Sequence, residues 1–136
     1  MFRPLPRCLL SAGAALLTMA CPPAQAHHSF AAFFDGVQTI KLTGKVVAFR
    51  FTNPHGIIAF QVVGADGNVK QWAAETNSPA VLMRRGWSRN SIKPGDTVTV
   101  EGWPSRDGKP YLRLRQALDA QGKPIGLSPF GQGDDK

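Results

Sequence analysis

The sequence predicts an all-β fold, a small barrel of five strands with one short helix between the third and fourth strands. Five segments of strand-forming residues alternate apolar and polar side chains, and turn sequences rich in Gly, Asn, Asp and Pro separate them. One stretch after the third segment carries residues that start and stop a helix. No internal repeat is visible, so we expect a single domain.

The first expected strand, residues 38–51, is long and changes its inward face. Ile40 and Leu42 alternate with polar residues, whereas after Gly44 the apolar residues occupy odd-numbered positions. A glycine at such a switch is typical of a bulge or sharp bend in a barrel strand. We therefore predict a bend at Gly44, followed by a loop at residues 52–56 (TNPHG).

Residues 57–63 and 69–75 are the second and third expected strands, and they predict a hairpin. The residues between them include ADGN, in which Gly and Asn tolerate the positive φ of a tight turn. The hairpin would place these two strands side by side and antiparallel.

Residues 77–86 (NSPAVLMRRG) predict a short helix. The Asn-Ser pair can cap its start, Pro79 fits the first turn, and Gly86 can adopt the left-handed conformation that stops a helix. Because so short a helix is marginal alone, packing must hold it.

The last two expected strands are residues 97–101 and 111–117, each preceded by a turn sequence. The second of them alternates Leu with Arg, so its leucines would face the core and Arg113 and Arg115 the solvent. The expected order is three strands, a short helix and two more strands, and the first strand is long and bent. An OB-type five-stranded barrel has this order. We therefore expect an OB-like architecture.

Residues 1–26 predict a secretory signal peptide with a basic start, an apolar stretch and the cleavage site AQA. The apolar stretch is shorter than the roughly 20 residues that a membrane span needs. We therefore expect an exported, periplasmic protein that is not transmembrane after processing. Residues 27–125 would form the barrel, and residues 126–136 a flexible, turn-rich tail.

An alternative is a lipoprotein signal in which Cys21 becomes the lipidated first residue. Thr18 and Met19 match such a signal poorly, and the Ala-x-Ala step favours cleavage after Ala26. That cleavage would remove Cys8 and Cys21, the two cysteines of the chain, and cysteine chemistry with them.

Lys and Arg outnumber Asp and Glu by 16 to 9. In an exported protein this balance favours anionic lipid or polysaccharide over nucleic acid as a partner, although solubility alone also accounts for it. Outward Arg113 and Arg115, together with Lys41 and Lys45, would form a basic strip if the fifth strand lies beside the first. Such cations are also ordinary on a solvent-facing strand.

Five short motifs resemble those of a family of small exported bacterial proteins classed as a domain of unknown function. They are AHHSF, FTNPH, RRGW, KPGD and VEGWPSRDG. The resemblance implies a small exported β-barrel domain and supplies no activity. The element order is also similar, more weakly, to that of bacterial OB-fold periplasmic proteins, which implies architecture only.

Cleavage after Ala26 would make His27 the first residue, so that its α-amine and imidazole could chelate one metal ion. Nitrogen-rich sites favour Cu(II), and His28 and His55 could add further imidazoles. Copper is therefore the cofactor that these three histidines would take. The alternative is a flexible, solvated end whose copper affinity is a generic peptide property.

The loop that holds Asn53, Pro54 and His55 is one of two that border the ligand face of an OB-type barrel. Asn53 and His55 are therefore candidate ligand contacts, although the same tripeptide also fits a simple turn. The other candidate ligand-binding residues are those that could line a pocket beside the helix: Trp72, Glu75, Arg84, Arg85 and Trp87.

Each of these candidates also has a structural interpretation. The tryptophans, Trp103 among them, fit equally as plugs at the ends of the barrel core. Glu75 fits a surface ion pair with Arg84 or Arg85, and one carboxylate without a matched partner is thin support for catalysis.

The sequence contains no GxSxG, no HExxH and no phosphate-binding glycine loop, so we expect no enzyme. We expect an exported OB-like binding or accessory module whose partner is an unknown small ligand or an envelope protein. One alternative is a periplasmic copper-binding protein that uses His27, His28 and His55. Another is a structural partner of an envelope complex.

Overall fold

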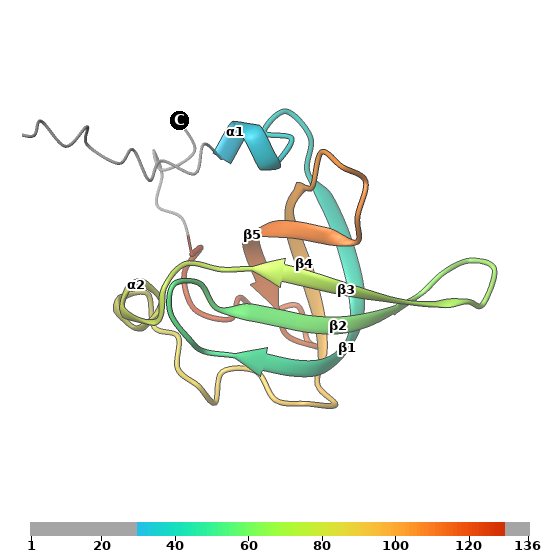
Figure 1. The fold of residues 1–136 in the computed structure, drawn as a ribbon. Helices are drawn as coiled ribbons and strands as arrows, with labels where there is room; N and C mark the ends of the chain where they lie inside the picture. The colour runs from blue at the N-terminus through green and yellow to red at the C-terminus, as the bar shows by residue number, and fades with distance from the viewer. Residues whose placement is uncertain (1–29, 130–136) are drawn as a thin grey trace, which may run out of the picture.

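The structure is a computed structural model that describes residues 30–129. In this part of the chain five strands form one closed barrel in the order β1-β2-β3-β5-β4 (Figure 1). The strands are β1 (Ile40–Arg50), β2 (Ile57–Val63), β3 (Val69–Glu75), β4 (Thr97–Pro104) and β5 (Tyr111–Leu118). The helices are α1 (Phe30–Phe33) and α2 (Pro79–Arg84). The predicted barrel, with one short helix between the third and fourth strands, is confirmed.

Strand β1 closes the barrel by pairing with two neighbours. Its first half is antiparallel to β4, from Ile40 beside Gly102 to Lys45 beside Thr97, and its second half is antiparallel to β2. Strand β5 lies between β4 and β3, and its short pairing with β3 is parallel. The expectation that the fifth strand lies beside the first is therefore wrong.

The inward face of β1 switches at Val47, not at Gly44 as predicted. The register shifts between Val46 and Ala48, and Val46 is buried while Val47 is 42% exposed. Gly44 has a different role: a Cβ there would lie 2.3 Å from the carbonyl oxygen of Gln61. The close passage of β2 therefore requires glycine at this position.

The core fills the barrel with aliphatic and aromatic side chains from all five strands and from α2. Fully burying one such side chain contributes roughly 1.5–3 kcal/mol. The core side chains with the least exposure are Ile58, Phe60, Ala74, Leu82, Val98, Val100, Leu112, Leu114 and Ala117.

Helix α2 has the predicted start and stop. Pro79 stands in its first turn after Ser78, which has an extended backbone and makes no side-chain cap bond. Gly86 has φ +80°, and its N–H donates to the carbonyl of Met83. Leu82 is fully buried, so packing holds this short helix as expected. Neither described helix has the length and apolar character needed to cross a membrane.

The segment that contains α1 covers the outer side of β4 and β5 and was not predicted. Phe30 makes an edge-to-face contact with Trp103 at 5.2 Å between ring centroids, and Phe34 stacks on Tyr111 at 5.9 Å. The Asp35 N–H also donates to the Pro104 carbonyl at 2.9 Å. This segment shields Trp103 and Tyr111 from solvent.

The first four residues of the expected tail, 126–129, are hydrogen-bonded to the segment after α2. The Leu127 N–H donates to the Arg85 carbonyl at 2.9 Å, and Trp87 Nε1 donates to the Leu127 carbonyl at 2.8 Å. Pro129 is almost fully buried. The expected signal peptide, with His27 and His28, and the residues after 129 lie outside the described part of the chain.

Candidate functional site

Polar side chains meet on the outer surface where the β1–β2 loop passes the ends of β3 and β5. The sheet register explains their proximity, because Glu75 on β3 stands between Ile57 on β2 and Arg113 on β5. The Gly56 carbonyl accepts from the Thr76 N–H and the Gly56 N–H donates to the Asn77 carbonyl, which fixes the loop against the end of β3. We call the group the Glu75 cluster, and its members are His55, Glu75, Asn77, Tyr111 and Arg113.

Glu75 is the acceptor at the centre of the cluster. Its Oε1 lies 2.8 Å from His55 Nδ1 and accepts from Arg113 Nη1, while its Oε2 accepts from the Tyr111 hydroxyl. Arg113 Nη2 also donates to Asn77 Oδ1 at 3.1 Å. Three polar neighbours on one carboxylate hold it in one orientation.

Burial divides the cluster into an inner pair and an outer imidazole. The Glu75 and Arg113 side chains are 15% and 12% exposed, whereas the His55 side chain is 39% exposed. A buried ion pair costs desolvation of both charges, and removal of either partner leaves the other charge uncompensated. The Glu75–Arg113 pair therefore holds the cluster in place, and His55 is its most exposed member, which solvent or a ligand can reach.

Two members of the cluster have shifted pKa values. Burial raises the pKa of the Tyr111 hydroxyl well above its ordinary value, and its hydrogen bond to Glu75 adds to the shift. Burial also lowers the pKa of the Arg113 guanidinium, while attraction to Glu75 opposes that effect. Tyr111 therefore stays a donor, and Glu75 keeps Arg113 charged.

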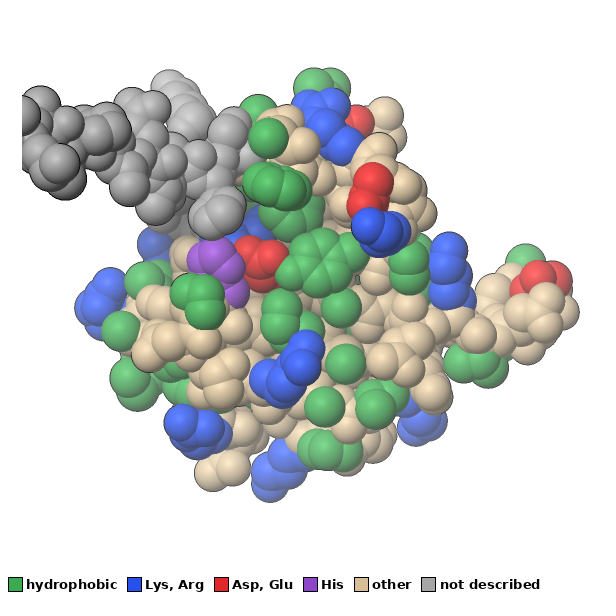
Figure 2. All heavy atoms as spheres, viewed as in Figure 1, with side chains coloured by type: hydrophobic (Ala, Val, Ile, Leu, Met, Phe, Trp, Pro, Cys, Tyr) green, Lys and Arg blue, Asp and Glu red, His purple; other side chains and the backbone are tan. Residues whose placement is uncertain are grey.

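The contact with Glu75 determines which nitrogen of His55 faces outward. Because Nδ1 lies 2.8 Å from a carboxylate oxygen of Glu75, a proton on Nδ1 is the favoured arrangement of the neutral ring, and it leaves Nε2 with an available lone pair. In Figure 2 a histidine side chain lies at the surface beside an acidic one. An oriented imidazole of this kind can accept a hydrogen bond from a ligand or coordinate a metal ion.

The structure brings together only two of the predicted ligand-binding residues, His55 and Glu75. Asn53 is exposed in the same loop, and Arg84 is exposed on α2. Glu75 binds Arg113 and His55, so the predicted ion pair with Arg84 or Arg85 is wrong.

The remaining predicted contacts have structural roles. Arg85 Nη1 donates to the Ser128 carbonyl at 2.9 Å, and Trp87 is buried in the core. Trp72 packs against the core, with the Lys70 ammonium 5.4 Å from its ring centroid. The core interpretation of Trp72 and Trp87 therefore fits better than ligand contact.

The expected basic strip does not form. Arg113 is paired with Glu75, while Arg115 and Lys41 are both paired with Glu101, at 3.0 and 3.8 Å. Strand β4 also lies between β5, which carries Arg113 and Arg115, and Lys45 on β1. An anionic partner would therefore bind a set of cations other than these four.

Sequence patterns alone did not identify Tyr111 and Asn77 as members of the site. Tyr111 and Arg113 are two residues apart in β5, so both side chains point outward on the same face. This pair of neighbouring hydrogen-bond donors was one feature of the sequence that indicated the site. That signal becomes informative only once β5 is placed beside β3. Asn77 was considered only as a helix cap.

The described residues hold no group of three or more potential metal ligands. Within them His55 and Glu75 form a pair, and Glu75 uses its oxygens for protein donors. Two of the three predicted copper ligands, His27 and His28, lie outside the described residues.

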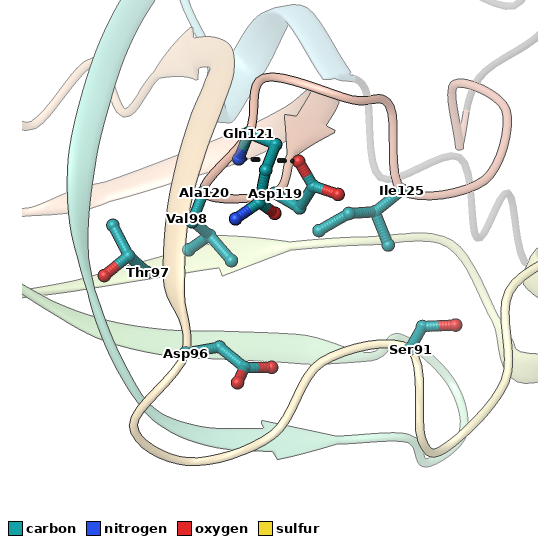
Figure 3. A pocket seen from close by; sticks show the side chains of 8 residues that line it. All are labelled: Ser91, Asp96, Thr97, Val98, Asp119, Ala120, Gln121 and Ile125. Carbon is teal, nitrogen blue, oxygen red and sulfur yellow. Dashed lines mark hydrogen bonds between the residues drawn. The ribbon is translucent and has the colours of Figure 1, made fainter.

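A cavity of about 310 Å³ lies elsewhere, between the start of β4 and the turn after β5 (Figure 3). Its two carboxylates stabilise turns: Asp96 accepts from the Lys93 N–H at 2.8 Å, and Asp119 accepts from the Gln121 and Lys123 N–H groups. The acidic side chains of this cavity therefore have a structural role.

The fold and the site define a small β-barrel protein with a carboxylate-oriented histidine at one loop. The model of a family described as a family of unknown function (DUF6152) matches residues 15–112, and the chain belongs to that family. The matched range includes His55, Glu75 and Tyr111 and ends one residue before Arg113. No sequence match was found among curated proteins.

Proposed function

We propose that this protein is an exported, periplasmic OB-like binding module whose ligand contacts His55 at the loop between β1 and β2. The observation that carries the proposal is the 2.8 Å contact between His55 Nδ1 and Glu75 Oε1. It leaves Nε2 as an oriented acceptor on an exposed loop, and loops held by a rigid scaffold are where binding residues concentrate. The partner is a small ligand or an envelope protein.

The arrangement supports binding more than catalysis. The Glu75 carboxylate accepts from three donors, so it positions His55 and is not available as a general base. Tyr111 keeps its proton because its pKa is raised, and it serves as a fixed donor. The cluster is thus built to present one imidazole nitrogen in one direction.

Amide NMR spectra of the ¹⁵N-labelled, processed protein test this proposal. The probes are Cu(II), Zn(II), inorganic phosphate and soluble peptidoglycan fragments, each added separately. We expect one probe to shift the amides of residues 52–56 and of Glu75, and His55→Ala to abolish those shifts. His55→Gln offers a hydrogen-bonding control of similar size.

Two results would contradict the proposal. One is a probe that shifts the amides around the cavity near Val98 and leaves residues 52–56 unchanged. The other is binding at the loop with the same affinity in the His55→Ala variant.

A second candidate function is copper binding, which the His55–Glu75 contact favours. Histidines that bind metals usually donate their other ring N–H to a carboxylate or carbonyl, and His55 has that arrangement before any metal is added. After cleavage behind Ala26, the α-amine and imidazole of His27 and the imidazole of His28 would complete a nitrogen-rich site. In the described chain Phe34 stacks on Tyr111, which contacts Glu75, so the N-terminal segment runs beside the cluster.

Copper titration with electron paramagnetic resonance tests this candidate. We expect the processed protein to bind one Cu(II) more tightly than a matched protein that carries one extra residue before His27. His55→Ala should weaken that binding and change the spectrum. Equal affinity and equal spectra for the three proteins would reduce the site to generic peptide binding and remove the candidate.

A further inference from the structure

Exposed cations without a carboxylate partner gather on one face of the described barrel. They come from β1, from α2 and from the segment that links α2 to β4. We call this surface the basic face, and its cations are Lys45, Arg50, Arg84, Arg89 and Lys93. Figure 2 shows Lys and Arg side chains scattered over the lower part of the viewed face, where no acidic side chain is visible.

Contacts place Arg89 and the Lys93 turn beside β1, which carries Lys45 and Arg50, and Arg84 ends α2 shortly before that linking segment. The Arg89 guanidinium lies 5.6 Å from the ring centroid of Phe51, the residue that follows Arg50. The turn at Lys93 is joined to β1, because the Gly95 N–H donates to the Val46 carbonyl at 2.8 Å. The nearest turn carboxylate, Asp96, lines the cavity shown in Figure 3 and caps the Lys93 N–H.

Aliphatic side chains are exposed beside the same cations. Val47 is 42% exposed at the β1 bulge, two residues after Lys45, and Met83 is 59% exposed next to Arg84. A surface that combines cations with exposed aliphatic side chains suits an anionic bilayer, where headgroups bind the charges and the acyl boundary takes up the apolar groups. A soluble polysaccharide would use the charges but gain nothing from Val47 and Met83.

We propose that the basic face docks this protein on an anionic lipid surface. The charges are complementary, since each Lys or Arg near such a surface strengthens binding about fivefold. The Glu75 cluster does not supply these cations, because its Arg113 is paired with Glu75. Docking on lipid thus uses different side chains from ligand binding at His55, and the two surfaces adjoin at Arg50, whose charge acts on Tyr111.

Vesicle sedimentation of the exported protein tests the proposal. The vesicles contain phosphatidylcholine alone or an equal mixture of phosphatidylcholine and phosphatidylglycerol. We expect binding only to the mixture, with affinity that falls as salt screens the charges. The triple variant R50Q/R84Q/R89Q should bind about a hundredfold more weakly, as three fivefold losses imply.

A second triple variant, K41Q/K109Q/R115Q, is the matched control. It changes the net charge equally but removes cations that are paired with Glu101 or Asp107. We expect it to bind nearly as well as the original protein. Equal losses in the two triple variants would show that net charge alone drives binding and would overturn the assignment of the basic face.

The aliphatic side chains distinguish a lipid surface from a polymer. Val47→Ser with Met83→Ser should weaken binding to the mixed vesicles and leave any binding to soluble alginate unchanged. Binding to alginate as tight as to the vesicles, with no effect of these two substitutions, would overturn the proposal in favour of an anionic polymer. Failure to bind the mixed vesicles at low salt would also overturn it. Far-UV circular dichroism confirms that each variant is folded.

Discussion

At the scale of single residues, the Glu75 carboxylate determines what its neighbours can do. It holds the His55 ring by Nδ1, neutralises the buried Arg113, and keeps the Tyr111 hydroxyl protonated. Removal of Glu75 would leave a buried guanidinium without its counter-ion, which typically costs about 3–5 kcal/mol. The residue that supports the site is thus also a residue on which stability depends.

Tyr111 reports on this cluster directly, because it is the one tyrosine in the chain. Its pKa is raised first by burial and then by Glu75, so we expect the folded protein to ionise well above pH 10 in an ultraviolet absorbance titration. The unfolded chain should titrate at about 10. Because the folded state keeps its proton longer, this group's contribution to stability is complete below pH 10 and declines as the pH rises further.

Substitutions in the N-terminal segment separate the two causes of the shift. Phe34 covers the Tyr111 ring, so Phe34→Leu should lower the tyrosine pKa while the Glu75 contact keeps it above 10. Phe33 is 55% exposed, and Phe33→Leu is the matched control that should leave the pKa unchanged. A folded protein that titrates at the same pH as the unfolded chain would contradict this account of Tyr111.

At the scale of elements, the bent strand β1 is the one on which barrel closure depends. It contacts β4 with its first half and β2 with its second, and Gly44 stands where β2 approaches most closely. Gly44→Ala places a methyl group 2.3 Å from a backbone oxygen, which cannot move without disturbing the β1–β2 pairing.

Urea unfolding should therefore show that Gly44→Ala lowers the free energy of unfolding by about 3 kcal/mol, the upper part of the usual cost of overpacking. Gly67→Ala is the matched control, since Gly67 has φ +78° and nothing lies within 4 Å of its Cβ position. In that control the free energy of unfolding should fall only by the left-handed backbone strain, about 1–2 kcal/mol. A smaller loss for Gly44→Ala than for Gly67→Ala would show that β1 and β2 are not in close contact there.

The short segment 126–129 is a second element that the barrel needs. Removing it leaves three donors, on Asn77, Arg85 and Trp87, without their carbonyl acceptors. At about 1 kcal/mol for each lost hydrogen bond, a chain ending at Ile125 should be about 3 kcal/mol less stable than one ending at Pro129. Equal urea midpoints for the two truncated chains would contradict this role.

At the scale of the whole molecule, local sequence patterns predict most of the fold. Alternation and turn residues are local signals, so the strands and α2 begin and end close to their predicted positions. The inward switch of β1 was misplaced because Val46 and Val47 are both apolar, and only pairing with β2 and β4 decides which one is buried. The α1 segment carries no local signal for its packing against Trp103 and Tyr111.

Only part of the candidate site could be predicted from the sequence, because its other members are brought in by strand pairing and not by local patterns. His55 could be singled out because the sequence predicted an OB-type barrel whose ligand face this loop would border, and Glu75 because it could line a pocket beside the helix. Arg113 and Tyr111 join them through the parallel pairing of β3 and β5, a contact between segments 38 residues apart in the case of Glu75 and Arg113. Expecting β5 beside β1 instead assigned Arg113 to a basic strip that the barrel does not form.

The central claim is that Glu75 orients His55 so that Nε2 faces outward as a binding atom. Long-range ¹H–¹⁵N correlation spectra of the folded protein at neutral pH measure which ring nitrogen of His55 carries the proton. For the neutral form of the ring we predict a proton on Nδ1 and none on Nε2, because Nδ1 lies 2.8 Å from the Glu75 carboxylate. A His55 ring that carries its proton on Nε2 would contradict the claim and with it the proposed binding site.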